Sequence, residues 1–410
     1  MIEENTATEH APSAGPLAGI RVLELCNVIA GPTTCQVLGD FGAEIIKIEH
    51  PADGDGSRSQ GRSKDGKPLW WKMLGRNKRS VGMYLGDPEV AETFLKLVAT
   101  ADVIVEGFRP GTLEKWNLGY NRLSDVNPGI ILARITGYGQ EGPYSGRPAF
   151  GSNLEAMAGL PHLTGDPNGP PTMSIYALGD YLGAVSLVGA IMFALYHRDV
   201  RGGGGQVIDA SLLSPMMTMM SHGIMQYDQL GIDEARGGNR STSNAPRNIY
   251  KTLDEKWISV AAATTPLAER IMRLVGAEEL TNEPWFATGR GRAEHVDVVD
   301  GAVAEWIRDR TRDEVMLAAA KENVTFAPVY SIGEMVEDLH VRETNMLTRV
   351  RDDDLGDLLM PNVMFNFSAT PGRIKWTGEP LGKSTDAVLN QELGVDNELL
   401  REMRSRGAIR

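Results

Sequence analysis

The sequence predicts an α/β fold in which helices cover both faces of a parallel sheet. Short apolar segments alternate with helical segments over the first 150 residues, and this alternation is typical of such sheets. The chain has 410 residues, more than one hydrophobic core usually holds, so a second domain is expected. Together these observations predict a large parallel-sheet domain with a smaller α/β domain.

The predicted strands are short, apolar and separated by helical patterns. We expect strands over residues 20–25, 44–49, 102–106, 130–135, 207–211 and 257–261. We expect helices over residues 35–42, 88–100, 112–116, 265–275, 300–320 and 396–406. The segment Ala30-Gly-Pro-Thr-Thr34 is expected to end the first strand and to form a loop before the helix. Parallel sheets bind ligands at the carboxyl ends of their strands, so the loops there are candidate sites.

The pattern changes after about residue 220, where a polar, glycine-rich stretch replaces the regular alternation. We therefore expect residues 1–220 to form the first part of the large domain and 221–334 to form the small α/β domain. Residues 335–410 are expected to return to the large domain. The first fifteen residues are acidic and polar, and we expect a flexible tail there.

Composition excludes several classes of protein. The net charge of −13 is the opposite of the basic face that binds nucleic acid. Cys26 and Cys35 give neither a disulfide framework nor metal-ligand spacing, so we expect two buried thiols and no metal. Residues 1–15 lack the features of a signal peptide, so a cytoplasmic location is expected. The apolar stretch 181–196 contains a glycine, and we interpret it as too short to span a membrane.

The pair Gly179-Asp180 stands immediately before this apolar stretch, which has the pattern of a buried helix. Aspartate is among the best N-cap residues because its oxygen accepts the unpaired N–H groups of the first turn. A carboxylate at this place is also well positioned to react, because the helix start is rigid. The residues alone leave both interpretations open.

A series of short motifs extends over the whole chain in a fixed order. They are residues 17–25, 30–32, 38–49, 54–55, 77–80, 101–106, 108–111, 136–140, 179–180, 205–206, 209–211 and 406–409. This series resembles the class III CoA-transferases, the group of formyl-CoA transferase, carnitine CoA-transferase and the bile-acid-inducible F type. That family shares its fold with the α-methylacyl-CoA racemases.

The resemblance implies a fold, an assembly and a reaction. The fold is a Rossmann-like large domain built from both chain ends plus a small domain, in an interlocked homodimer. The reaction transfers CoA from an acyl-CoA to a small carboxylic acid, with CoA as substrate and without metal, nicotinamide or flavin. Asp180 is then the nucleophile, and it forms a mixed anhydride followed by an aspartyl-CoA thioester.

The resemblance also implies which residues contact CoA, between the large domain of one subunit and the small domain of the other. The CoA set is Asn27, Ile29, Ala30, His50, Arg79, Met83, Phe108, Arg109, Thr112 and Lys115. The acyl-pocket set is Tyr138, Gln140, Phe150 and Gly179. Relatives often have Arg at the positions of His50 and Lys115, and Asn at that of Gly107, which puts individual CoA contacts in doubt.

Two other functions fit parts of the sequence. A 2-methylacyl-CoA racemase needs an acid and a base on opposite sides of the α-carbon. Phe150 stands where racemase relatives have a histidine, and phenylalanine cannot move a proton. A non-catalytic CoA-binding protein is expected to lack the nucleophile, whereas Asp180 is present. A nicotinamide-dependent oxidoreductase is disfavoured because the loop after the first strand is no GxGxxG.

Overall fold

The computed structural model describes residues 15–410, so most of the predicted tail at 1–15 lies outside the described residues. The chain divides into two compact units. The large unit contains residues up to Ala158, Ser174–Ile224 and Arg342–Arg410. The small unit contains Gly159–Met173 and Met225–Val341. Each unit is described by itself below.

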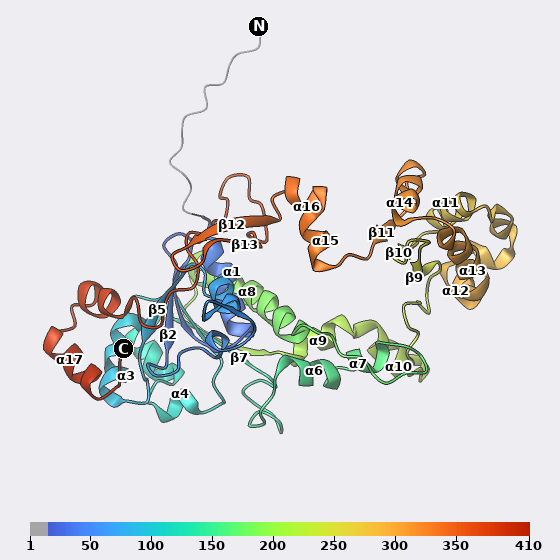
Figure 1. Ribbon diagram of the computed structural model, residues 1–410. Coiled ribbons are helices and arrows are strands. Elements are labelled where there is room, and N and C mark those ends of the chain that lie inside the picture. Colours follow the sequence, from blue (N-terminus) through green and yellow to red (C-terminus); the bar gives the residue numbers. More distant parts are fainter. Residues whose placement is uncertain (1–14) are drawn as a thin grey trace, which may run out of the picture. The chain divides into compact units, whose positions relative to one another are not determined.

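A six-stranded, all-parallel sheet forms the centre of the large unit (Figure 1), and the predicted α/β fold class is confirmed. Its order is β5-β2-β1-β6-β7-β8. The strands are β1 (Arg21–Leu25), β2 (Glu44–Glu49), β5 (Lys78–Gly82), β6 (Val103–Glu106), β7 (Ile131–Thr136) and β8 (Val207–Ser211). Leu25 pairs with Glu106, so the carboxyl ends of β1 and β6 meet at one edge.

Alternate side chains of each strand enter two separate cores, one on each face of the sheet. Leu23 and Ile46 face a core with α3 (Pro88–Val98), α5 (Tyr120–Val126) and α17 (Asn397–Ser405). Val22 and Ile45 face a core with α1 (Ala30–Asp40) and α8 (Leu178–Asp199). Both faces are therefore covered, as an all-parallel sheet requires.

Two elements beside the first strands differ from prediction. Helix α1 begins at Ala30, five residues earlier than expected, because Pro32 is tolerated in the first turn, where its N–H has no partner in any case. Strand β5 was not predicted because it begins with Lys78 and Arg79. Lys78 is nevertheless 1% exposed, and its charge is paired with the buried Glu24 at 2.8 Å.

The predicted apolar helix is longer and less buried than expected. Helix α8 has 22 residues, and an 18-residue window within it has a mean hydropathy of 1.7, so by length and composition alone it could cross a membrane. The prediction that this stretch is too short was therefore wrong. One side of α8 packs against α1, where Thr34 Oγ1 donates to Ala184 O at 3.2 Å. Phe193 on another side is 78% exposed.

The remaining elements of the large unit are short. They are β3 (Ser63–Lys64), β4 (Lys67–Pro68), α2 (Leu69–Leu74), α4 (Thr112–Lys115), α6 (Gly151–Met157), α9 (Leu213–Met219), β12 (Leu347–Asp352) and β13 (Gly356–Pro361). Short 3-10 and π turns lie at Gly56–Arg58 and Ala387–Glu392. Helix α10 (Ser221–Leu230) and helix α16 (Leu339–Glu343) span the last two of the four places where the chain passes between the units.

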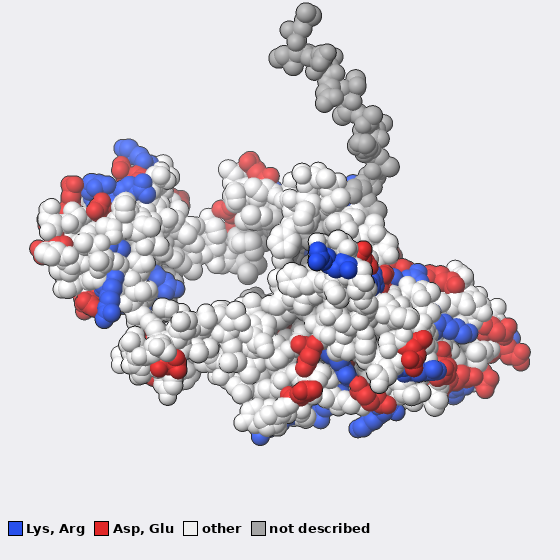
Figure 2. All heavy atoms as spheres, turned by 180° about the vertical axis from the view of Figure 1, so that it is seen from behind, with Lys and Arg blue, Asp and Glu red and all other residues white. Residues whose placement is uncertain are grey.

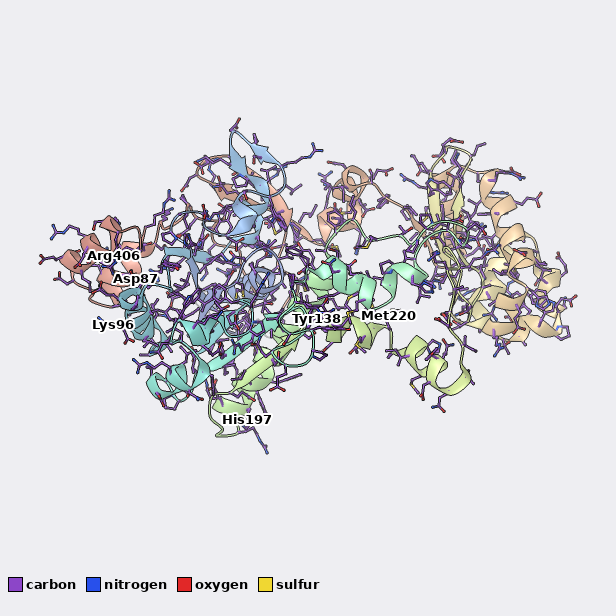
Figure 3. The ribbon with its side chains drawn as sticks, turned by 90° about the horizontal axis from the view of Figure 1, so that it is seen from below. Asp87, Lys96, Tyr138, His197, Met220 and Arg406 are labelled. Carbon is purple, nitrogen blue, oxygen red and sulfur yellow. The ribbon has the colours of Figure 1, made fainter. Side chains whose placement is uncertain are left out.

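The segment after residue 378 covers the outer edge of β5. Ser384 N donates to Ser80 O at 2.9 Å, and Arg410 N donates to Gly82 O at 3.1 Å. Arg406 then pairs with Asp87 at 3.0 Å, which joins the end of α17 to the start of α3 (Figure 3). On the face shown in Figure 2, acidic and basic side chains are interspersed over this unit.

The small unit has a three-stranded antiparallel sheet with helices around a separate core. Its strands are β9 (Arg247–Lys251), β10 (Trp257–Ala261) and β11 (Phe326–Pro328). Its helices are α7 (Leu160–Leu163), α11 (Thr265–Val275), α12 (Gly289–Glu294), α13 (Val296–Arg308), α14 (Arg312–Lys321) and α15 (Ile332–Glu337), with 3-10 turns at Glu278–Asn282 and Pro284–Ala287. The helix predicted at 300–320 is two helices, because Thr311 caps a new one.

Candidate active site

Asp180 lies in the first turn of α8, at the carboxyl edge of the sheet. Helix α8 connects β7 to β8, which are parallel neighbours, so it runs back against the strand direction and begins at their carboxyl edge. Asp180 is the third helical residue, and the N-cap residue is Ala177. The N-cap interpretation of Asp180 is therefore wrong.

The Asp180 carboxylate lies directly against the start of α6. The backbone N–H of Gly151 forms a hydrogen bond with it. A Cβ atom on Gly151 would stand 2.1 Å from Asp180 Oδ2, and a Cβ on Gly179 would stand 2.9 Å from Gly151 O. These two glycines thus permit the starts of α6 and α8 to approach this closely.

A second carboxylate, that of Glu155, supports the same turn from inside the protein. Glu155 is fully buried, and its Oε1 accepts the Gly179 N–H at 2.9 Å. Its Oε2 accepts from Ser174 Oγ at 3.0 Å. Glu155 therefore joins α6 to the loop before α8 and to the first turn of α8.

This environment makes Asp180 an unusually basic aspartate. Burial raises the pKa of Asp180 to about 6, the Gly151 hydrogen bond opposes the rise, and the Glu155 charge adds to it. Tyr181 follows on the same helix, where burial raises the pKa of the phenol and the Trp70 indole N–H donates to it. A carboxylate with a raised pKa at a helix start is a candidate nucleophile.

Phe150 is the N-cap residue of α6 and directly precedes Gly151, whose N–H binds the Asp180 carboxylate. Its side chain is 69% exposed. The phenyl ring of Phe150 has no proton to exchange. Phe150 therefore cannot supply the acid or base that a racemase needs beside Asp180.

A pocket of about 250 Å³ opens at the carboxyl ends of β1, β2, β5 and β6. It is lined by Leu25, Cys26, Asn27, Ile48, Glu49, His50, Met83, Tyr84, Leu85, Phe108 and Trp116. Four of the predicted CoA contacts, Asn27, His50, Met83 and Phe108, are in this lining. Phe108 packs edge-on against Trp116 with ring centroids 5.1 Å apart. The pocket has room for one end of a molecule as large as CoA.

The turn between this pocket and α1 is strained. Val28 has φ +72°, a left-handed conformation that a β-branched residue rarely adopts. Its N–H donates to Asp55 Oδ1 at 3.1 Å, which holds the turn in place. Strain of this kind collects at ligand-binding sites. Ile29 and Ala30 follow directly as the N-cap and first residue of α1.

Asp55 is itself fixed by a buried network of ion pairs. Lys47 Nζ lies 2.7 Å from Asp55 Oδ2 and 2.6 Å from Glu24 Oε1, and all three side chains are buried. Burial lowers the pKa of Lys47, but the two carboxylates raise it more, so the ammonium charge is retained. Asp55 N donates in addition to Glu49 Oε2 at 2.9 Å.

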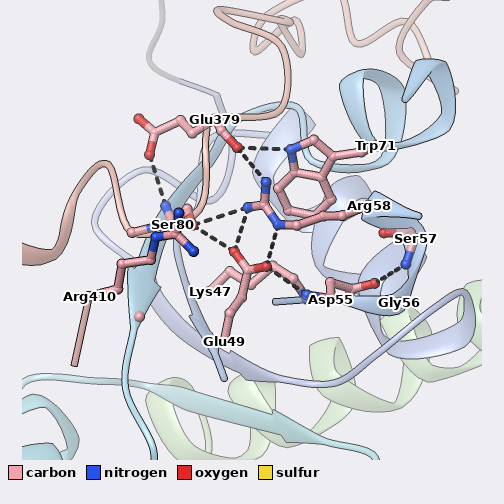
Figure 4. A network of polar contacts seen from close by, with 12 residues as sticks. Lys47, Glu49, Asp55, Gly56, Ser57, Arg58, Trp71, Ser80, Glu379 and Arg410 are labelled. Atoms are coloured by element: carbon pink, nitrogen blue, oxygen red, sulfur yellow. Dashed lines mark hydrogen bonds and ion pairs between the residues drawn. The ribbon is translucent and has the colours of Figure 1, made fainter. Parts of the chain in front are cut away.

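Figure 4 shows how this network continues into the C-terminal segment. Glu49 binds Arg58 through both carboxylate oxygens, at 2.7 Å each. Arg58 Nη1 then donates to Glu379 O at 3.0 Å, and Ser80 N donates to Glu379 Oε2 at 2.9 Å. The strained turn is thereby connected to the chain segment that covers β5.

The remaining predicted CoA contacts separate into two groups. Arg79 lies at the opposite edge of the sheet, at the start of β5, where it pairs with Glu44 and Glu392 at 2.6 Å each. We therefore remove Arg79 from the CoA set. Arg109 and Lys115 are exposed and are the sequence neighbours of the pocket residues Phe108 and Trp116; Thr112 begins α4 and Lys115 ends it.

Tyr138 and Gln140 follow β7, as predicted, at the carboxyl edge of the sheet (Tyr138 is labelled in Figure 3). Tyr138 packs edge-on against Tyr144 at 5.6 Å, and Arg147 lies over Tyr144 at 3.8 Å. Gln140 N is held by Asp209 at 3.0 Å. The amide nitrogen of the Gln140 side chain is buried without a protein hydrogen-bond partner.

Sequence reasoning missed Glu155, the Lys47–Asp55 pair and the aromatic pocket residues Tyr84 and Trp116. A glutamate inside a short helix has the same pattern as a solvated one, so nothing in the sequence marks Glu155 as buried. Lys47 stands within an apolar strand, and a charge at that place is a usable signal of a buried pair.

The fold and the site define a parallel-sheet α/β protein with a partly buried carboxylate beside the carboxyl edge of its sheet, and the comparisons show its family. The family model for CoA-transferase family III matches residues 17–385. The chain therefore belongs to CoA-transferase family III, and the resemblance seen in the sequence is confirmed. It is a CoA-transferase, an enzyme of acyl-CoA metabolism.

Individual relatives are similar over nearly their whole length. The chain is 38% identical to the succinyl-CoA–D-citramalate CoA-transferase of Chloroflexus aurantiacus over 395 residues, 96% of this chain and 98% of the relative. It is 33% identical to the succinate–glutarate CoA-transferase of Agrobacterium fabrum over 386 residues, 91% of this chain and 95% of the relative. A crystal structure of a CaiB/BaiF family protein from Brucella suis matches with TM-score 0.80 at 29% identity, covering 92% of this chain and 99% of that one.

Proposed function

We propose that this enzyme moves CoA from an acyl-CoA donor to a free carboxylic acid through covalent intermediates on Asp180. The observation that carries the proposal is the partly buried Asp180 carboxylate, with a pKa raised to about 6, fixed between two helix starts. An ionised carboxylate of raised basicity is a better nucleophile than a free one, and its fixed position lowers the entropic part of the barrier.

In the first step Asp180 Oδ attacks the thioester carbonyl carbon, and the C–S bond breaks with its electron pair leaving on the CoA sulfur. The products are a mixed anhydride and CoA thiolate. The thiolate then attacks the Asp180 carbonyl carbon, which releases the donor acid and leaves aspartyl-CoA. The acceptor acid repeats both steps in reverse order, so no proton is gained or lost overall.

The pocket at the carboxyl ends of the strands supports a place for CoA. Phe108 and Trp116 offer aromatic surface to an adenine, and exposed Arg109 and Lys115 offer charge to phosphates. The strained turn at Asn27–Ala30 lies between this pocket and α1, which packs on α8. We propose that the pantetheine arm follows this turn toward Asp180.

The relatives guide the choice of acids. Both are described as using succinate or its CoA ester, and we propose dicarboxylic acids as substrates of this chain. We also propose an interlocked homodimer, a cytoplasmic location and no metal, as the family resemblance implies. The exposed apolar side chains of α8, among them Phe193 and Tyr196, support a covered face there.

The test is CoA exchange from succinyl-CoA to a panel of labelled mono- and dicarboxylic acids, followed by mass spectrometry. Wild-type enzyme is expected to form the new acyl-CoA, and hydroxylamine is expected to trap a hydroxamate at Asp180. Full activity of D180A contradicts the role of Asp180. Deuterium exchange at the α-carbon of a 2-methylacyl-CoA, without acid exchange, favours the racemase instead.

A further inference from the structure

Glu155 is a buried carboxylate that accepts a hydrogen bond from Gly179, the residue before Asp180. It is fully buried in α6, and it accepts hydrogen bonds from Gly179 N at 2.9 Å and Ser174 Oγ at 3.0 Å. The Gly179 N–H is one of the first-turn donors of α8 that have no partner inside the helix. Glu155 supplies that partner, although it does not belong to α8.

The charge of Glu155 needs an explanation beyond these two hydrogen bonds. A glutamine has the same shape and would satisfy both groups, because its oxygen can accept from Gly179 N and its amide can donate to Ser174 Oγ. A second carboxylate beside Asp180 instead adds repulsion between like charges in a buried turn. That repulsion raises the basicity of Asp180, and this favours the reaction if the Asp180 carboxylate is the nucleophile.

We propose that Glu155 is a positioning residue for the reaction of Asp180, which fixes the Gly179–Asp180 peptide and whose charge makes the Asp180 carboxylate a stronger nucleophile. This inference rests on the proposed function of Asp180. The titratable groups that interact with Asp180 are Glu155 from α6 and Tyr181 on its own helix. Trp70 of α2 donates a hydrogen bond to Tyr181 and carries no charge.

Two substitutions separate geometry from charge. E155Q keeps both hydrogen bonds and removes the charge, so Asp180 ionises more easily. The acidic limb of the kcat profile, which follows the Asp180 carboxylate, is then expected to shift to lower pH by about half a unit or more. E155L removes both hydrogen bonds, and kcat is expected to fall about 100-fold, the order caused by misplacing a reacting group by about 1 Å.

The KM for succinyl-CoA is expected to stay near the wild-type value in both variants, because Glu155 is not part of the pocket lining. The matched control is D300N, which changes a buried carboxylate of the small unit that Tyr250 binds at 2.7 Å. D300N is expected to leave the pH profile unchanged. Circular dichroism of each variant reports folding separately from activity.

The outcomes are distinct. A folded E155L enzyme with wild-type kcat overturns the positioning role, and an E155Q profile that coincides with wild type overturns the role of the charge. If the kcat of E155Q is as low as that of E155L, positioning by the hydrogen bonds and the effect of the charge are not separate roles. Failure of the proposed function looks different: the wild-type enzyme transfers no CoA, or D180N remains fully active.

Discussion

The carboxylate of Asp180 occupies the space into which a side chain on Gly151 would project. G151A is therefore expected to displace the carboxylate, because the new Cβ would stand 2.1 Å from Asp180 Oδ2. We expect kcat for CoA transfer to fall about 100-fold. The new Cβ would also stand 2.8 Å from the backbone nitrogen of Asp180, so we expect a loss of stability as well. The measurement is steady-state transfer from succinyl-CoA beside thermal unfolding.

The matched control for this change is another helical glycine. Gly301 lies in α13 with no atom within 4 Å of its Cβ position. G301A is expected to raise stability by about 1 kcal/mol, because alanine is the better helix former, and to leave kcat unchanged. Equal activity of G151A and G301A would mean that the close approach of α6 and α8 is irrelevant to the reaction.

Asp180 also makes the folding stability of the protein depend on pH. Its pKa is about 6 in the folded protein and 3.8 without the fold. Between these values the folded chain binds more protons than the unfolded chain, so this group makes folding less favourable as pH rises. Below pH 4 the carboxyl is protonated in both states and the penalty is absent.

D180N removes that penalty. We expect the variant to be inactive and about 1–2 kcal/mol more stable than wild type at pH 7, a value already reduced for the partial exposure of Asp180. The two stabilities are expected to converge below pH 4. Urea unfolding at several pH values checks this, and a constant difference across the range would argue against a raised Asp180 pKa.

At the scale of elements, the turn after β1 depends on a buried cation. K47M leaves Asp55 and Glu24 without the Lys47 ammonium, and it is expected to lower the unfolding free energy by about 3–5 kcal/mol. Because Asp55 holds the Val28 N–H, the KM for acyl-CoA is expected to rise as well.

The control for K47M is an exposed ion pair. Arg122 and Glu92 lie 3.1 Å apart with 41% and 59% of their side chains exposed. R122M is expected to change stability by less than about 1 kcal/mol. Chemical denaturation measures both variants, and a loss in K47M as small as that in R122M would show that the network is not needed for stability.

The elements with a clear apolar period were predictable from the sequence, and those set by charge pairs were not. Strands such as β6, Val-Ile-Val-Glu, are almost wholly apolar, and β6 was placed within a residue. Strand β5 begins with charges that become buried only because Glu24, far away in the sequence, pairs with Lys78. Asp180 was found from its motif, whereas Glu155 depends on tertiary contacts that no local pattern encodes.

At the scale of the whole molecule, the large unit leaves apolar side chains uncovered. On α8, Phe193 is 78% exposed and Tyr196 is 57% exposed, and on α9, which packs against α8, Met217 is 47% exposed. Monomeric soluble proteins rarely expose apolar side chains in such numbers on neighbouring elements. The proposed homodimer would cover them.

Light scattering after size exclusion is expected to give twice the mass of one chain, 44.6 kDa, for the wild type. F193E places a charge on this face and is expected to weaken the dimer and reduce activity. L317E makes the same kind of change at another exposed position, on α14, and is expected to leave the mass unchanged. A monomeric, fully active wild type would rule out the dimer.

The edge of β5 is covered by a part of the chain that is synthesised much later than β5 itself. Gly82 N donates to Thr385 Oγ1, a partner 303 positions further along the chain. While a ribosome adds those residues, β5 has an open edge that can pair with any other strand. Nascent chains of this enzyme are therefore expected to need protection by chaperones until the segment after residue 378 emerges.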